Sequence, residues 1–311
     1  MQNKIKNRYI EIANNDDNLL IFNKPWWLDL QDVNWKVIEI PYDNQKSILI
    51  PIFERRKFFF KYSVLPNLVH KICPIYIENK GAIENKFFDN LFLKTKEFLY
   101  FSITLFENLN LKNIYKKNNF EIVTSKSYFV NKKNKDYKNK FNSDVKRLIN
   151  KSKSNRLLFK SINDVEYFIK KYNQNLTNSK KKNYFSNKQI KKVYEKLKQH
   201  KCGKIFGVFD EKNNLHSCAL IAWDMNDVYL IFFSSNNALK KYGGSCFLIE
   251  RLINFSQKIN RNFDFEGGTI KSIGNFYMKF TTSFKELHQM DIYKYKFLKR
   301  LFNFYFKYWK F

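Results

Sequence analysis

The sequence predicts a mixed α/β protein built from two domains, and three observations support this fold class. The 311 residues are about two average domains long, and 44% of them are apolar, which is enough for a core in each half. All five prolines lie before residue 75 and separate short apolar runs, such as 35–40 and 47–52, that are typical of strands. Strand and helix patterns then alternate in the second half. The predicted class is therefore α/β, with mixed sheets of the α+β type.

The first half is expected to form one domain over residues 1–130. The segment 87–106 has the apolar spacing of a helix, and 120–130 is predicted to be a closing strand. The stretch NKKNKDYKNK at 131–140 is too polar to bury itself, so we place the domain boundary there. Beyond it we expect a basic connecting segment at 131–160, a second domain at 161–291 and an aromatic, basic tail at 292–311.

Two capping boxes predict where helices of the second domain begin. In this motif the first side chain accepts a hydrogen bond from a backbone N–H of the first turn, and the second side chain reaches back. Asn163 with Glu166, and Ser186 with Gln189, have the required spacing. Each pair predicts one helix start.

A meander followed by a crossover is predicted after these helices. Three β-rich runs are separated by the turn clusters EKNN and DMND, and they lie at 204–210, 215–224 and 228–234. A helix at 245–260 and a short strand at 262–266 come next. Because a strand, a helix and a strand follow in order, we expect a parallel crossover.

The positive charge is concentrated in the second half. Of the formal net charge of +29, residues 1–130 carry +5 and residues 131–311 carry +24. An AT-rich genome produces a composition rich in Lys, Asn, Ile and Phe by codon bias alone. If the charge has a function, it favours an anionic partner such as tRNA, a phosphorylated cofactor or an acidic membrane surface.

Several classes are not expected from the composition. No stretch of about 18 uncharged apolar residues occurs, and the first residues lack the apolar core of a signal peptide, so a cytoplasmic protein is expected. The four cysteines are far apart, and the four histidines have no metal-ligand spacing. We therefore expect no metal site, and we infer no obligate protein partner.

A glycine-containing loop separates the last meander strand from the helix that follows. It contains Lys240, Lys241, Gly243, Gly244 and Ser245. Glycines let a backbone approach a phosphate closely, and the N–H groups and dipole of a helix N-terminus favour its negative charge. The loop is a candidate phosphate site, and the alternative is an ordinary glycine turn that opens a helix.

Two carboxylates end the strand predicted after that helix. In a strand, Asp264 and Glu266 point to one face, and Phe263 and Phe265 point to the other. Burying two carboxylates without partners is costly, so this pair is a candidate site. A salt bridge to one of the many lysines is the alternative.

Two aromatic features have both a structural and a functional interpretation. Trp26 and Trp27 follow a proline, and they either belong to the core or line a substrate cleft. The tail at 292–311 contains ten aromatic and six cationic residues. It either packs on its domain or lies at an anionic membrane surface.

The motifs around these residues resemble one protein family. FDFEGG, followed by IGNFYMKF, resembles the C-terminal signature of the FemAB-like branch of the GNAT acyltransferase superfamily. IFNKPWWLDL, VKRLINKSKSNRLLF and LIAWDMNDVYLIFFSS resemble other segments of such proteins. The glycine loop is similar to the GNAT phosphate loop Q/R-x-x-G-x-G/A, with Lys240 in the basic slot and Ser245 in the last small slot. The resemblance implies two tandem GNAT-like acyl-CoA N-acyltransferase folds, with an acceptor held in a cleft that involves both.

The resemblance also implies an acyltransferase and the ligands it uses. The donor is acetyl-CoA or another acyl-CoA, with aminoacyl-tRNA as the alternative, and the acceptor is an amine of a cell-envelope or small molecule. The tRNA-dependent branch has Phe-Lys where this chain has Phe276 and Tyr277. That departure lowers the weight of a tRNA-dependent peptidoglycan-precursor aminoacyltransferase. A non-catalytic RNA- or membrane-binding protein on a GNAT scaffold is a further alternative.

Each candidate residue has an expected role. Glu266, beside Asp264, is expected to take the proton of the attacking amine, and Tyr277 or backbone N–H groups near Phe233 and Ser234 to support the oxyanion. Lys279 is expected at the substrate if its segment is extended. The remaining assignments are the glycine loop, with Phe233 and Ser234, for the donor, Trp26 and Trp27 for the acceptor, and 292–311 for peripheral contact with the inner face of the membrane.

Overall fold

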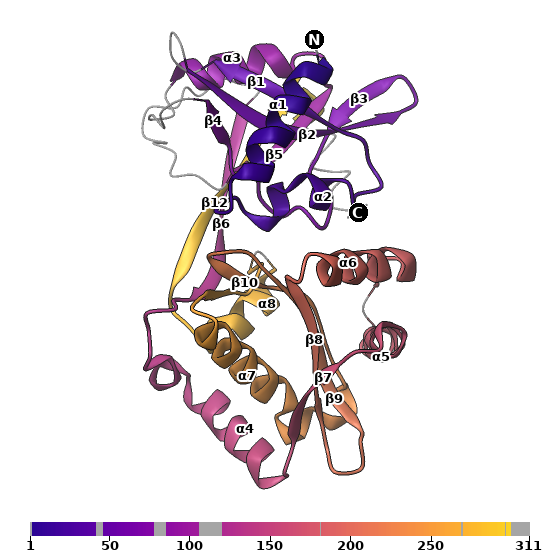
Figure 1. Ribbon diagram of the computed structural model, residues 1–311, viewed down its shortest axis with the longest axis vertical. Helices are drawn as coiled ribbons and strands as arrows, with labels where there is room; N and C mark the ends of the chain where they lie inside the picture. The colour runs from indigo at the N-terminus through magenta and orange to yellow at the C-terminus, as the bar shows by residue number, and fades with distance from the viewer. Residues whose placement is uncertain are drawn as a thin grey trace. The chain divides into compact units, whose positions relative to one another are not determined.

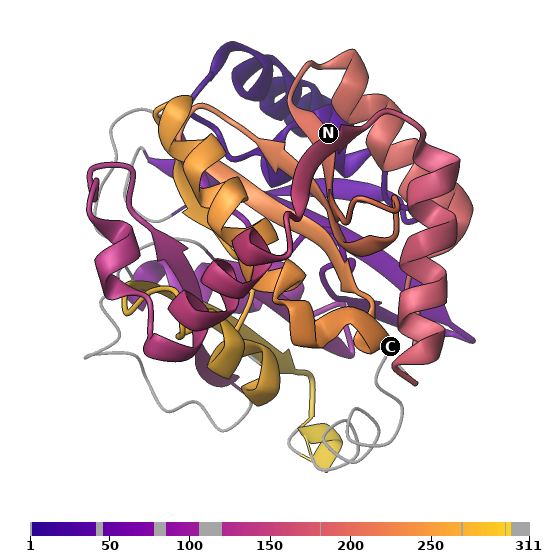
Figure 2. The same ribbon diagram turned by 90° about the horizontal axis from the view of Figure 1, so that it is seen from below.

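A computed structural model describes residues 2–41, 46–77, 85–105, 120–180, 182–268, 270–295 and 297–299. The chain divides into two compact units: unit 1 comprises residues 1–125 and 286–311, and unit 2 comprises residues 126–285. Figures 1 and 2 show the helices and strands of both units. Strands β6 (Phe120–Val130) and β12 (Phe284–Tyr293) each run from one unit into the other.

Unit 1 contains a mixed sheet with short helices. Its elements before β6 are α1 (Gln2–Asn15), η1 (Ile21–Asn23), α2 (Pro25–Leu28), β1 (Trp35–Pro41), β2 (Ser47–Lys57), β3 (Phe60–Ser63), β4 (Ile75–Ile77), α3 (Asn85–Thr95) and β5 (Tyr100–Leu105). β2 pairs antiparallel with β1, β3 and β4, and β5 pairs parallel with β3 and antiparallel with β12. The predicted strands at 35–40 and 47–52 are confirmed.

The helix predicted over 87–106 is wrong in its second part. Helix α3 ends at Thr95, whose hydroxyl donates to the carbonyl of Leu91, and strand β5 begins at Tyr100. In β5, Tyr100, Phe101, Ile103 and Leu105 are buried, and pairing with β12 and β3 supplies the hydrogen bonds. This strand pairing to distant segments overrides the local apolar spacing, and residue 106 lies outside the described ranges.

Unit 2 is organised around the predicted meander and crossover. Its elements after β6 are η3 (Tyr137–Lys140), α4 (Ser143–Ser154), β7 (Leu158–Ile162), α5 (Val165–Asn178), α6 (Asn187–Gln199), β8 (Gly203–Phe209), β9 (Leu215–Trp223), β10 (Asp227–Ser235), η4 (Asn237–Tyr242), α7 (Gly244–Lys258), β11 (Asn262–Asp264) and α8 (Lys271–Tyr277). β7 to β10 form an antiparallel meander, and β11 pairs parallel with β10 and antiparallel with β6. The mixed α/β class, the meander and the parallel crossover are confirmed.

The helices of unit 2 cover its sheet on two faces. Helices α7 and α4 lie on one face, and α5 and α6 lie on the other (Figure 1). Val228 and Leu230 of β10 belong to the core that contains Leu248 and Leu252 of α7, whereas Phe232 packs edge-on against Tyr172 of α5. The β10 register shifts between Leu230 and Phe232, which is a β-bulge. The bulge changes which side chains of β10 face α5.

Local predictions in unit 2 are partly corrected. Ser186 caps α6 through its hydroxyl, as predicted, but the cap of α5 is Asp164, whose carboxylate accepts from the N–H groups of Glu166 and Tyr167. The segment 131–140 was expected to be too polar for burial. It nevertheless inserts Tyr137, 4% exposed, into the core of unit 2.

None of the helices in the described ranges is both long enough and apolar enough to cross a bilayer. Residues 301–311, which form most of the predicted aromatic and basic tail, lie outside the described residues.

Candidate active site

Strands β10 and β11 form a short parallel pair and then separate. Their pairing covers only Asp227–Tyr229 of β10 and Asn262–Asp264 of β11, whereas β10 continues to Ser235 paired with β9. From Leu230 to Ser235, no described strand pairs with the β11-facing edge of β10. Backbone N–H and C=O groups on an unpaired edge are available to a ligand that carries amide groups.

The edge leads to the N-terminus of helix α7. Asn236 follows β10, and its side chain accepts from the N–H of Ala238 to open the 3₁₀ segment η4. Gly243 then turns the chain with a φ of 79°, and no side chain caps α7. The first N–H groups of an uncapped 15-residue helix have no helical partner, so this terminus favours an anion.

The two glycines of this loop have a packing role that the sequence did not indicate. A Cβ at Gly243 would lie 2.2 Å from the carbonyl oxygen of Leu148 in α4, and one at Gly244 would lie 2.6 Å from Cβ of His216. The hydroxyl of Ser217 donates to the carbonyl of Gly244 at 3.0 Å. Glycine is therefore required here because the protein's own chain approaches closely. The predicted role of these residues in donor binding stays a prediction.

Lysines gather near the first turn of α7. Burial raises the pKa of the Cys246 thiol to about 11; the charge of Lys279 lowers it, that of Asp144 raises it and that of Lys240 lowers it. Lys240 lies in η4, which leads into this turn, and Lys279 pairs with Asp144 of α4, a helix that packs on α7. The expectation of an extended segment for Lys279 is wrong: Lys271–Tyr277 form helix α8, and Lys279 then forms an ion pair with Asp144 of α4 at 3.5 Å.

Phe233 and Ser234 lie on the part of β10 that pairs with β9 but not with β11, and they face opposite sides. The ring of Phe233 lies 6.3 Å from that of Phe276 in α8. The hydroxyl of Ser234 accepts from the side-chain amide of Asn175 in α5 at 3.1 Å. Beside Asn175 and η4, a cavity of about 350 Å³ is lined mainly by amide side chains and Lys171. The side chain of Ser234 is thus held by α5.

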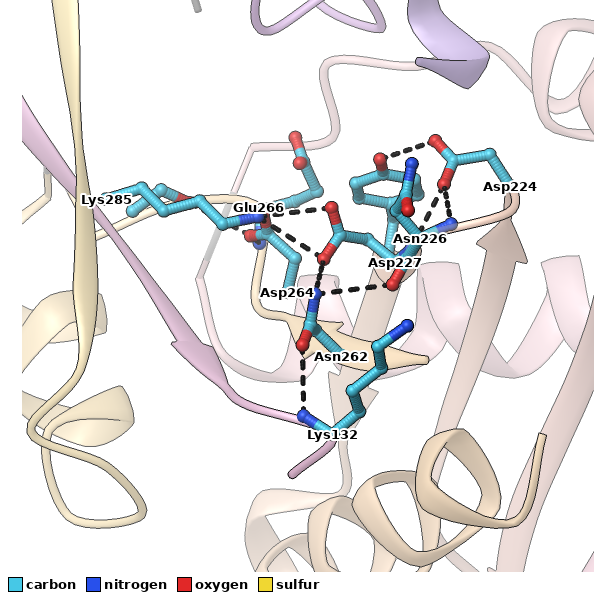
Figure 3. Close-up of polar contacts among 10 residues, drawn as sticks. Lys132, Asp224, Asn226, Asp227, Asn262, Asp264, Glu266 and Lys285 are labelled. Atoms are coloured by element: carbon cyan, nitrogen blue, oxygen red, sulfur yellow. Dashed lines mark hydrogen bonds and ion pairs between the residues drawn. The ribbon is translucent and has the colours of Figure 1, made fainter. Parts of the chain in front are cut away.

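Buried carboxylates gather where β10 and β11 begin to separate (Figure 3). Asp264 is fully buried and Asp227 is 4% exposed, and Lys285 Nζ lies 3.1 Å from Asp227 Oδ2 and 3.8 Å from Asp264 Oδ2. Asp264 also accepts from the hydroxyl of Ser127 and the N–H of Glu266. Desolvating carboxylates is costly unless they are paired and hydrogen-bonded, and here both conditions are met. The alternative of a salt bridge therefore applies to Asp264.

Glu266 is placed differently from Asp264. Strand β11 ends at Asp264, so the predicted alternation through 266 does not hold, and Glu266 adopts a left-handed φ of 49°. Glu266 is 9% exposed. Gly268 follows, where a Cβ would lie 2.8 Å from the carbonyl oxygen of Lys126. A strained backbone at the end of a splayed strand turns Glu266 away from the ladder and favours a functional role.

Tyr277 lies close to Glu266. Its ring packs 4.5 Å from that of Phe265 and is 9% exposed. Burial raises the pKa of Tyr277 well above its usual value, and the negative charges of Glu266 and Asp264 add to the rise. The phenol therefore stays protonated at neutral pH, and no described residue hydrogen-bonds to its hydroxyl. It is a donor available to a ligand.

The structure adds residues that sequence reasoning missed. Asn262 donates to Asp227 at 2.7 Å, and the hydroxyl of Tyr229 donates to Asp224 at 2.6 Å (Figure 3). The DMND cluster predicts only a turn from sequence, although Asp224 and Asp227 are its first and last residues. Lys285 carries no local signal because it follows Asp264 by 21 residues and reaches the cluster only through tertiary structure.

Comparison with known proteins supports the fold. No protein-family model and no curated protein matches the chain. The crystal structure of FemX superposes with a TM-score of 0.63 at 8% identity, over 95% of this chain and 97% of FemX. The chain has the fold of FemX. A conserved protein of unknown function from Bacteroides thetaiotaomicron is similar at a TM-score of 0.60 and 9% identity, over 94% of this chain and 96% of that one.

The same fold occurs in a third structure. The C-terminal domain of a candidate lysylphosphatidylglycerol synthetase from Agrobacterium fabrum matches at a TM-score of 0.59 and 9% identity, over 97% of this chain and 96% of that one. The FemAB-like fold implied by the sequence motifs is therefore confirmed. Because coverage of FemX is nearly complete, the likeness includes both units.

Within the FemX-like fold, Trp26 and Trp27 belong to unit 1. Trp27 is fully buried, and its indole donates to the carbonyl of Leu68 at 2.8 Å. Trp26 is half-buried and meets the Trp27 ring edge-on. Trp27 therefore has a core environment, and the proposed contact of the pair with an acceptor stays a prediction.

Metal and thiol chemistry receive no support from the described residues. No group of three or more His, Cys, Asp or Glu residues in the described ranges has a metal-binding arrangement. His216 is buried 3.5 Å from Asp210, and burial lowers its pKa.

The thiols of unit 2 are expected to react slowly. Burial raises the pKa of Cys202 and Cys218 to about 12 and that of Cys246 to about 11, so these groups stay protonated at pH 8. Because the thiolate is the reactive species, we expect labelling by a disulfide reagent at pH 8 to be at least about a hundredfold slower than in denatured protein. Fast labelling of Cys218 or Cys246 in the native state, measured by mass spectrometry, would contradict these shifts.

Proposed function

We propose that this chain is an acyltransferase that moves an acyl group from an acyl-CoA donor to an amine by direct transfer. The observation that carries the proposal is the unpaired edge of β10, which leads into the uncapped N-terminus of α7. The FemX-like fold supports it at the level of architecture. The acceptor is proposed to be a cell-envelope or small-molecule amine.

The residues present fit such a donor. Amide groups of a pantetheine arm match the unpaired N–H and C=O groups between Leu230 and Ser235. The N–H groups at Gly244 and Ser245, together with Lys240 and Lys279, would hold the pyrophosphate. When bound, the donor supplies an activated carbonyl carbon and a thiol leaving group.

The proposed chemistry assigns two tasks to this chain. Glu266 accepts the proton of the attacking amine, directly or through a water molecule. Tyr277 donates its phenolic hydrogen to the carbonyl oxygen as negative charge develops there, and its raised pKa keeps that hydrogen in place. The protonated thiols of Cys218 and Cys246 favour direct transfer over a covalent enzyme intermediate.

Aminoacyl-tRNA is the second candidate donor, favoured by the charge of +24 on residues 131–311. The name of the similar protein from Agrobacterium fabrum indicates a lysylated phosphatidylglycerol as a product of that protein. A non-catalytic RNA-binding role predicts steeply salt-dependent RNA binding without acyl transfer.

Donor binding is tested by thermal stability with acetyl-CoA and free CoA, because a ligand specific for the native state raises Tm. Both ligands are expected to raise Tm, and Lys240→Ala with Lys279→Ala should weaken binding about tenfold by removing two cations from the pyrophosphate. Lys258→Ala, at the opposite end of α7, is the matched control. The absence of any shift at millimolar ligand would reject acyl-CoA, and the same variants would then be tested with charged tRNA.

A further inference from the structure

The β2–β3 hairpin of unit 1 carries three exposed aromatic residues at its tip. The strands pair from Glu54 with Ser63 to Lys57 with Phe60, so Phe58 and Phe59 form a two-residue loop. Figure 1 shows this hairpin reaching out from the other elements of unit 1. Phe58 is 87% exposed, Phe59 is 83% exposed and Phe60 is 42% exposed. By contrast, Phe53 on the same strand is fully buried.

The two residues of this loop contradict ordinary turn preferences. Phe58 has a φ of 55°, in the left-handed region where a bulky side chain is a genuine outlier. Two-residue hairpin loops normally use Asn-Gly or a similar pair, because those residues adopt positive φ at little cost. Phe58 and Phe59 therefore weaken the turn and bury nothing in exchange. A feature that is costly for folding and that exposes apolar surface is expected at an interaction site.

Positive charges surround the aromatic tip. Between Glu54 and Lys61 the sequence ERRKFFFK contains four cations and one anion. Glu54 already pairs with Lys36 and Arg56, and Lys61 pairs with Glu97 at 2.8 Å. The ring of Phe59 lies 4.2 Å from that of Phe60, so these two side chains form one apolar surface. Aromatic groups at a tip with Lys and Arg behind them match the depth profile of an anionic bilayer surface.

We propose that the β2–β3 hairpin tip, residues Arg55–Lys61, is a membrane-contact element that inserts Phe58, Phe59 and Phe60 among anionic lipids. The cations would meet the headgroups while the rings enter the acyl boundary. Charge complementarity selects an anionic lipid surface over a neutral one. The exposed rings select a lipid surface over a nucleic acid, because a bilayer offers them an apolar layer. This inference does not depend on the proposed acyltransferase function.

Vesicle sedimentation of the full chain tests the element. The chain is expected to bind vesicles of phosphatidylglycerol and phosphatidylcholine and to bind pure phosphatidylcholine weakly. Phe58→Ser with Phe59→Ser should lower the partition coefficient at least about tenfold, because two large apolar groups no longer insert. Arg56→Gln with Lys57→Gln should lower it about fivefold per cation at low salt, and only on anionic vesicles.

Leu93→Ser provides the matched control, since Leu93 lies on α3 of the same unit and is 58% exposed. This variant should bind like the unmodified chain, and all variants should keep their Tm. Unchanged binding of the double Phe variant would overturn the proposal and would leave residues 292–311 as the membrane contact. The proposal would equally be overturned if light scattering showed a dimer for the unmodified chain and a monomer for the double Phe variant, with unchanged vesicle binding. The tip would then contact a second copy of the chain.

Discussion

Replacing Glu266 by Gln is expected to lower kcat by about 10²- to 10⁴-fold, the range typical of a lost general base. The neutral amide cannot accept the proton of the amine. It has the same size as the carboxyl group and leaves unchanged the hydrogen bond that the backbone N–H of residue 266 donates to the Asp264 carboxylate. KM for the donor and Tm should therefore be almost unaffected. Steady-state kinetics with the donor established by the binding experiment, together with thermal unfolding, measure these effects.

Two further variants define that result. Glu211→Gln removes an exposed carboxylate, 3.4 Å from Arg156, that should not affect turnover. Asp264→Asn, in contrast, should lower stability, because it removes the charge that Lys285 and Ser127 contact in a fully buried position. If Glu266→Gln retained full turnover, Glu266 would lose its role as base. If it unfolded like Asp264→Asn, its role would be structural.

Replacing Gly243 by Ala is expected to lower the free energy of unfolding by about 2–4 kcal/mol. The alanine would have to adopt a φ of 79°, and its methyl group would lie 2.2 Å from the carbonyl oxygen of Leu148. This oxygen belongs to the backbone of helix α4, which cannot easily move aside. Urea denaturation measures this change.

Lys240→Ala is the control for Gly243→Ala, because it alters an exposed residue of the same loop and should change stability by less than about 0.5 kcal/mol. A Gly243→Ala protein of normal stability but reduced affinity for CoA would show that the glycine serves the ligand rather than α4. If the expected instability is found, lysine variants are the correct probes of donor binding.

Local patterns were sufficient for much of unit 2. The order β8, β9, β10, α7 and β11 follows from apolar periodicity and turn residues, and Ser186 identifies the start of α6 through a bond within its own first turn. The FDFEGG motif predicts Asp264 and Glu266 as candidate site residues. These predictions succeeded because their physical causes operate over a few residues.

Other features depended on contacts between distant segments. Tyr100–Leu105 forms a strand because β12 and β3 pair with it. The first five residues of IGNFYMKF belong to helix α8, so the segment is not extended. The sequence does not predict the hairpin tip at Phe58, because FFFK has the apolar composition of a strand and contains no turn residue.

The sequence by itself determined the α/β class, the crossover from β10 through α7 to β11 and the residue types available for chemistry. Only the tertiary structure decided which of those residues meet. Lys285 joins Asp227 and Asp264, Lys279 and Lys240 both lie near α7, and Gly243 accommodates α4. The physical reason is that hydrogen bonds and periodicity act locally, whereas desolvation and charge pairing depend on which distant segments the sheet brings together.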